Sequence, residues 1–221
     1  MSLDLSLDAF NVLCTKSEGR DKVARLVQYA ARAFVGCTSP LHPKAHTPLH
    51  TAQAHARTIM TSLGSARRTH RWCKEIPVII NLPKSFQIKD PIDSILDLMQ
   101  KLSLITFLMT DHLAMLKQWN FLSAGKRSAA QTVQAALKFF CISNTFALII
   151  QLKKYLSLPK DEEKASQRKE CLKAAFKAFL LMIQTAHLSL VYQTHDSIVG
   201  IAGIISSWMD VQAQWPKKKI A

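Results

Sequence analysis

The first third of the chain concentrates positive charge in segments whose apolar residues recur at helical spacing. Residues 16–74 hold 11 Lys and Arg against only Glu18 and Asp21, in a chain whose formal net charge is +14. Three prolines between residues 40 and 48 divide this region, because proline does not continue a helix. The pattern therefore predicts two basic amphipathic helices joined by a proline-rich loop. It restricts the chain to folds that give such helices an apolar surface to lie on.

The first of these segments, residues 19–34, has an apolar stripe on one face and polar residues with cations on another. The stripe consists of Val23, Leu26, Val27, Ala30 and Phe34. The second face consists of Lys22, Arg25, Tyr29 and Arg32. Because two acidic residues, Glu18 and Asp21, lie at its start, we expect this helix to serve in packing or self-association.

The second segment, residues 52–74, contains no acidic residue and is the better candidate for contact with lipid. A narrow apolar stripe beside Arg and Lys is typical of a helix that lies in a membrane interface. We therefore predict that residues 56–74 bind lipid through Arg57, Ile59, Met60, Leu63, Arg67, Arg68, Arg71, Trp72 and Lys74.

Helical patterns continue to the C-terminus, and no strand alternation is visible. Helices are expected over about residues 5–35, 52–74, 90–120, 127–157, 161–194 and 197–214. The predicted fold class is all-α, a membrane-associated bundle of about six helices with N-terminal basic amphipathic helices and a C-terminal apolar helical hairpin. We expect two regions: residues 1–89, which end in a proline-rich connector, and the membrane-associated residues 90–221.

Three apolar stretches are candidates for crossing a membrane, which takes about 20 mostly apolar residues. They are residues 139–158, 178–195 and 197–216, and flanking lysines make the first the poorest candidate. The last two are expected to form the hairpin, in which Gly200 and Gly203 would permit close helix packing. Hydropathy alone leaves open whether these stretches span a membrane or form the core of a soluble bundle.

No pattern in the chain predicts an enzyme or a cofactor. Five scattered cysteines without a C-x-x-C pair favour a reducing compartment. The spacing of His42, His46, His50 and His55 is the most metal-like feature, but prolines among them prevent a regular helix. A solvated loop is therefore the better interpretation of residues 36–51.

Four short blocks, in order along nearly the whole chain, carry a family resemblance. The first block contains Arg20, Asp21, Lys22 and Tyr29, and the second contains Leu63, Ala66, Arg67, Arg68 and Arg71. The third block contains Asp111 and His112, and the fourth contains Gly200, Gly203, Ser206 and Ser207. Together they resemble the peroxin-eleven family of peroxisomal membrane elongation and division proteins. Met115 and Asn120 depart from the family pattern. The acidic N-terminal start points to the kinetoplastid branch, the glycosomal integral membrane proteins.

The resemblance implies a peroxisomal (glycosomal) membrane protein with both termini towards the cytosol. It implies organelle proliferation by membrane remodelling, elongation and fission through an amphipathic helix, here residues 56–74. The implied partners are anionic phospholipid, further copies of the chain and the organelle fission machinery.

Two other functions and one terminal signal stay open at this point. A channel for small metabolites would place Gln184, His187 and Asp210 along a shared lumen. A soluble nucleic-acid binder would account for the charge, but the chain has no recognition helix or zinc spacing, so nucleic acid is not expected. Lys218 and Lys219 stand where a dilysine signal for coatomer would lie, or they form a basic tail near anionic lipid.

Overall fold

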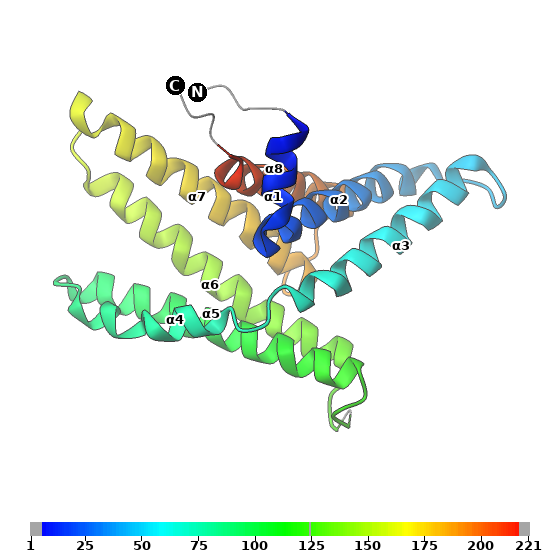
Figure 1. Cartoon of the computed structure of the whole chain (residues 1–221), viewed down its shortest axis with the longest axis horizontal. Coiled ribbons are helices and arrows are strands. Elements are labelled where there is room, and N and C mark those ends of the chain that lie inside the picture. The colour runs from blue at the N-terminus through cyan, green and yellow to red at the C-terminus, as the bar shows by residue number, and fades with distance from the viewer. Residues whose placement is uncertain (1–5, 124, 217–221) are drawn as a thin grey trace. The chain divides into compact units, whose positions relative to one another are not determined.

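The computed structural model describes residues 6–123 and 125–216, which are helical almost throughout and contain no strand (Figure 1). The α-helices are α1 (Leu7–Thr15), α2 (Ser17–Thr38), α3 (Pro48–Thr69), α4 (Glu75–Ile80), α5 (Pro91–Gln118), α6 (Ala129–Ser157), α7 (Glu162–Leu188) and α8 (Asp196–Gln214). Two short 3₁₀-helices, η1 (Ser39–Leu41) and η2 (Leu82–Gln87), join them. The all-α prediction is confirmed. The helix count exceeds six because extended backbone at Lys16 separates α1 from α2 and because the proline-rich connector contains α4.

Side-chain caps and prolines set the starts of the long helices. Thr47 accepts a hydrogen bond from the backbone of His50, and Pro48 occupies the first turn of α3. Asp90 and Pro91 begin α5 in the same way. Ser128 and Gln131 form a reciprocal capping box at the start of α6. These are the positions where a proline or a short polar side chain is favourable, because the first backbone N–H groups of a helix lack partners.

The helix predicted over residues 52–74 is displaced towards the N-terminus. It begins at Pro48, because proline at a first helical position starts a helix rather than ending one. It ends at Thr69, and the following residues form a turn in which Cys73 has a φ of 63°. Arg71, Trp72 and Lys74 therefore do not lie on α3, and the prediction that they share a helix with Arg57 is wrong.

The described chain forms two compact units. One joins the residues up to His70 with those from Thr194 onward, and the other consists of Arg71–Gln193. The division into residues 1–89 and residues 90–221, which the sequence predicts, stays a prediction.

In the first unit, α2 packs against α8, α3 and α1. Helices α2 and α8 run antiparallel and approach closely where α8 has glycine. A Cβ on Gly200 would collide with the backbone of Ala33, and one on Gly203 would collide with the ring of Tyr29. The two glycines of the fourth block thus pack against the helix that carries the first block.

In the second unit, α6 packs against α5 and also against α7, while α4 and η2 lie along α5 (Figure 1). Phe107, Leu108 and Ala136 form its buried core, and the rings of Phe107 and Phe140 stack with centroids 4.4 Å apart. Near the start of α5, Lys153 donates a 2.7 Å hydrogen bond to Asp90, which keeps the pKa of that carboxyl below its ordinary value.

An apolar helical hairpin is present in the C-terminal half. It pairs α7, which contains most of residues 178–195, with α6 rather than with residues 197–216. By length and composition, α6 and α7 are the described helices that are long and apolar enough to cross a membrane. The ranking of residues 139–158 as the poorest candidate is therefore wrong. Residues 197–216 belong to α8, which packs on α2.

We expect Gly203→Ala to destabilise the first unit by about 1–3 kcal/mol, because the added methyl overpacks the contact with Tyr29. Elsewhere in a helix interior the same change stabilises by up to about 1 kcal/mol. Thermal unfolding in detergent micelles, followed by circular dichroism, measures the difference.

Gly64→Ala on α3 is the matched control, since its methyl meets only the flexible end of the Gln28 side chain. It should be neutral or stabilising. Equal stabilisation by both changes would contradict the close approach of α2 and α8.

Candidate membrane-facing site

Two cations of α2, Lys22 and Arg25, point into the first unit and bind a carboxylate on α8. Arg25 donates from Nη1 to Asp210 Oδ2 at 3.2 Å and from Nη2 to Ser206 Oγ at 3.1 Å. Lys22 Nζ lies 3.5 Å from the same Asp210 oxygen. Arg25 is 7% exposed and Asp210 is 6% exposed. Because a buried charge is costly without a partner, these contacts fix which faces of the two helices meet.

Two further ion pairs hold α2 to its neighbours. Arg67 of α3 donates to Asp21 Oδ1 at 2.9 Å and to Gln28 Oε1 at 2.7 Å. At the other end of α2, Arg32 pairs with Asp196 at the start of α8. Asp21, Lys22 and Tyr29 of the first block are therefore interior residues that hold helices together. Arg20 of the same block is exposed and donates to the carbonyl of Cys14.

The apolar stripe of α2 faces outward. Val27 and Phe34 are exposed, and α8 likewise turns large apolar side chains away from α2. Those of α8 are Ile198, Ile201, Ile205 and Trp208. A helix on the surface of a soluble protein has the opposite arrangement, with the apolar stripe buried and the charges in water.

The residues predicted to bind lipid lie in several different environments. Arg57 and Ile59 are exposed on α3, whereas Met60 and Leu63 are half-buried. Arg67 is held by Asp21 and Gln28, and Arg68 is half-buried with interactions of its own. Arg71, Trp72 and Lys74 lie in the turn that begins the second unit, where Lys74 is half-buried.

A polar cluster in the second unit joins the second block to the third. Arg71 Nη1 lies 3.2 Å from Asp111 Oδ2, and Glu75 lies 3.7 Å from His112 Nδ1. The ring of Trp72 stacks on His112 with centroids 4.8 Å apart. Sequence reasoning assigned Arg71 and Trp72 to lipid and missed this pairing. The available signal was Asp111 itself, since a carboxylate inside a long apolar helix needs a cation nearby.

The α6–α7 hairpin is far more exposed than a pair of core helices. Only 17% of the apolar window of α6 and 28% of that of α7 are buried, whereas the core helix of a soluble protein is mostly buried. The polar groups inside the hairpin bond to nearby carbonyls: Asn144 donates to Phe140, and Gln184 to Leu180. This distribution suits helices whose large apolar side chains meet lipid.

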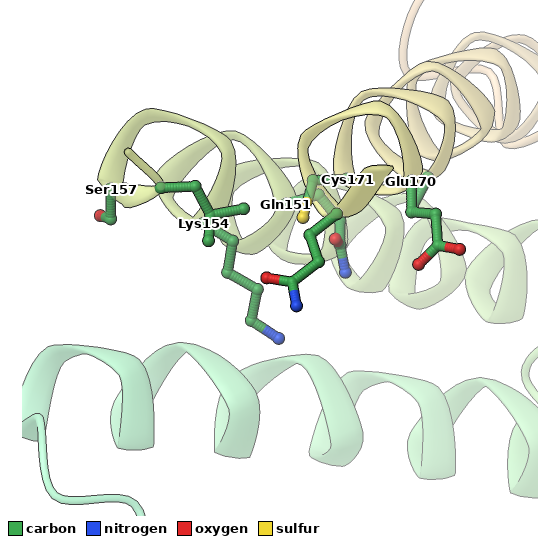
Figure 2. A pocket seen from close by; sticks show the side chains of 8 residues that line it. Gln151, Lys154, Ser157, Glu170 and Cys171 are labelled. Atoms are coloured by element: carbon green, nitrogen blue, oxygen red, sulfur yellow. The ribbon is translucent and has the colours of Figure 1, made fainter. Parts of the chain in front are cut away.

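A cleft of about 550 Å³ lies between the end of α6 and the first half of α7 (Figure 2). Figure 2 shows Gln151, Lys154 and Ser157 on α6 and Glu170 and Cys171 on α7 along its wall. Its lining has one carboxylate, one thiol and no histidine, so it offers no set of metal ligands. Over the described ranges, no group of three or more His, Cys, Asp or Glu is arranged to hold a metal.

Two of the three residues named for a channel have partners within their own units. Gln184 is buried in the second unit, and Asp210 is bound to Arg25 in the first. His187 is half-buried near the end of α7. Lys218 and Lys219, named for coatomer, lie outside the described residues.

Comparison with protein-family models matches residues 7–215 to Peroxisomal biogenesis factor 11 (PEX11). Comparisons with curated proteins and with solved structures gave no match. The matched range contains all four sequence blocks. The assignment to the glycosomal branch stays a prediction.

We expect Asp111→Asn to destabilise the protein by about 2–3 kcal/mol, because it removes the carboxylate charge that faces the Arg71 guanidinium in a mostly buried position. Chemical unfolding in detergent micelles measures the loss. The exchanged pair, Arg71→Asp with Asp111→Arg, should recover part of it. Asp8→Asn, at an exposed residue of α1, serves as the control. An Asp111→Asn variant as stable as the unsubstituted protein would show that the ion pair contributes nothing.

Proposed function

Because the chain belongs to the peroxisomal biogenesis factor 11 (PEX11) family, we propose that it remodels the peroxisomal membrane by inserting α3 shallowly into the cytosolic leaflet. Family membership supports a general role in peroxisome proliferation and a location at the peroxisomal membrane. Elongation and fission through α3 are the specific steps that we propose. The channel alternative has no observation in its favour, and two of its candidate residues, Gln184 and Asp210, are bonded within their own units.

The observation that carries this proposal is the surface of α3. From Pro48 to Thr69 the helix contains no acidic residue, and Arg57 and Ile59 are exposed on it. A cation near an anionic membrane surface contributes about 1 kcal/mol. Each apolar side chain moved out of water adds about 25 cal/mol per Å² of its surface. Because shallow insertion enlarges one leaflet more than the other, it favours curvature.

The contact with α2 determines which side of α3 meets the lipid. Arg67 at one end and Gln53 at the other are bonded to α2, through Asp21 and Thr38 respectively. Ala56 is buried, so the side of α3 opposite α2 is the accessible one. Thr58 and Ser62 lie on that side, and Arg57 and Ile59 are exposed on its two flanks.

We further propose that the α6–α7 hairpin anchors the protein across the bilayer. Hydropathy and low burial of both helices support this assignment. Both termini then lie on the cytosolic side, and the short loop between the two helices lies in the lumen. Self-association and contact with the fission machinery remain proposals that rest on the family resemblance.

Replacing Arg57 by Glu and Ile59 by Asp should strongly reduce membrane tubulation. The double change removes one attraction to anionic lipid, adds a repulsion and places a charge at an exposed apolar position. At about 1 kcal/mol per charge near the surface, we expect at least a fivefold loss. The measurement is the fraction of phosphatidylserine-containing proteoliposomes drawn into tubules, counted by electron microscopy.

Lys169→Glu makes the same charge reversal at an exposed residue of α7 and should leave tubulation nearly unchanged. Neither change touches the bond between Arg67 and Asp21. Equal tubulation by all three proteins would argue against α3 as the remodelling element.

The proposed anchor predicts the sidedness of single cysteines placed in a chain whose native cysteines are replaced by serine. In intact peroxisomes, Lys160→Cys in the α6–α7 loop should resist a membrane-impermeant maleimide. Ser6→Cys, before α1, should be labelled at once. Detergent should expose both. Rapid labelling of residue 160 in intact organelles would show that the hairpin does not cross the membrane.

A further inference from the structure

We infer that α2 and α8 lie together within the hydrocarbon of one leaflet, parallel to the membrane plane, with α3 above them at headgroup level. The partner of their outer faces is then the acyl chains of the lipids. This inference rests on the proposed function only in placing the protein at the peroxisomal membrane. It extends the inserted element from one amphipathic helix to a stack of three.

Beyond the first turn of α2, where Glu18 and Arg20 are exposed, the charges of the α2–α8 pair are compensated, and all but the partly exposed Asp196 are turned inward. The stretch of α2 from Asp21 to Thr38 and the whole of α8 contain six charged side chains. They are Asp21, Lys22, Arg25, Arg32, Asp196 and Asp210. Each lies in an ion pair: Lys22 and Arg25 with Asp210, Arg32 with Asp196, and Asp21 with Arg67 of α3. Charged groups in hydrocarbon are tolerated when they face the protein interior and pair with one another.

The outer surface of the pair is correspondingly apolar. Between Asp21 and Thr38, the exposed residues of α2 are Val27, Ala30, Phe34 and Cys37. On α8 they are Ile198, Ile201, Ile205, Trp208 and Ala213. No formally charged residue is exposed on either stretch. Water would favour the reverse arrangement, whereas hydrocarbon favours this one.

The outer faces point in different directions, which selects lipid over a second protein surface as their partner. At 100° per residue, the face of α2 that touches α8, the face that touches α3 and the exposed apolar face lie roughly 120° apart. Tyr29, Gln28 and Phe34 mark these three faces. The exposed face of α8 lies opposite the side that packs on α2. One flat partner cannot cover both apolar faces, but fluid acyl chains surround both.

The exterior of α3 determines how the stack is oriented. Bonds from Gln53 to Thr38 and from Arg67 to Asp21 show that α3 follows α2 along its length. Its outward residues include Arg57, Thr58, Thr61, Ser62 and Ser65. If α2 crossed the bilayer, α3 would carry Arg57 through the hydrocarbon, at a cost of about 2.5–3.5 kcal/mol for one arginine. Lying flat keeps α3 at the surface.

The dimensions of one leaflet accommodate this stack. Packed helices lie about 8–10 Å apart, and half of the hydrocarbon layer is about 15 Å thick. With α3 among the headgroups, both α2 and α8 then fit above the bilayer midplane. The outer side chains of α8 are the deepest.

Depth-dependent quenching of tryptophan fluorescence tests the arrangement in the full-length protein. In a background with all four tryptophans changed to Phe, one Trp is restored at residue 208 or introduced by Ile198→Trp, Phe34→Trp or Thr58→Trp. Each protein is reconstituted in vesicles of phosphatidylcholine and phosphatidylserine with bromines at shallow or deep acyl positions. Residues 198 and 208, at opposite ends of the outer face of α8, should be quenched alike. Deep bromines should quench both at least twice as strongly as residue 58.

Two results would overturn the inference. If both ends of α8 are shallow while Ile205→Trp is deep, α8 spans the bilayer. If residues 34, 198 and 208 are not quenched, water or protein covers them, and cross-linking through introduced cysteines shows which.

The ion pairs of Asp210 with Lys22 and Arg25 provide a second test in the same quenching assay. Asp210→Arg places a third cation beside Lys22 and Arg25 and should at least halve the quenching of Trp208. The exchange of Arg25→Asp with Asp210→Arg should restore it, whereas unchanged quenching in the single variant would contradict compensated burial. Circular dichroism verifies that each variant keeps its helices.

Measuring tubulation of the same vesicles distinguishes failure of this inference from failure of the proposed function. Tubulation without the depth pattern would refute the inference alone. The depth pattern combined with full tubulation by the Arg57→Glu, Ile59→Asp protein would refute the role of α3 alone.

Discussion

The packing of the first unit depends on one buried carboxylate, Asp210. Helix α8 contains no Lys or Arg, so the partner of this charge must come from another helix. Lys22 and Arg25 of α2 supply it, and their position sets the antiparallel register that brings Tyr29 onto Gly203. Once Lys22 and Arg25 face α8, the apolar stripe of α2 has to face outward. The inverted surface is therefore a consequence of the ion pair.

In the second unit, too, a buried carboxylate is paired with a cation from another segment. The basic segment around residue 70 supplies one arginine to each unit. Arg67 is bonded to Asp21 in the first unit, and four residues later Arg71 pairs with Asp111 in the second. Each arginine neutralises a carboxylate on a long helix. A run of cations that resembles a lipid-binding surface in the sequence thus has two interior roles, and Arg57 remains the exposed arginine of α3. Net charge counted along a segment overestimates the charge that a membrane meets.

Helix positions were largely predictable, because prolines and capping residues act locally. Thr47 with Pro48 and Asp90 with Pro91 start helices by chemistry visible in the sequence, although the rule that proline ends a helix predicts a break at Pro48. The end at Thr69 was not predictable, since the apolar spacing continues to Cys73 while the backbone turns there. Periodicity also finds two faces on α2 without showing which is buried. That choice depends on Asp210, 185 residues from Arg25 along the chain. For α6, Lys153 counted against a membrane span, although it is bonded to Asp90 and Asp93.

The two units contribute differently to curvature under the arrangement proposed here. A hairpin that crosses the bilayer, such as α6 with α7, takes up nearly equal area in both leaflets and creates little asymmetry between them. A stack confined to one leaflet enlarges only that leaflet. Because α2 and α8 reach below the headgroups, they displace acyl chains as well as headgroups, and they do so with ion pairs that keep the helices together at depth. The force that bends the membrane therefore originates in the first unit, and the second unit serves to keep it at the bilayer.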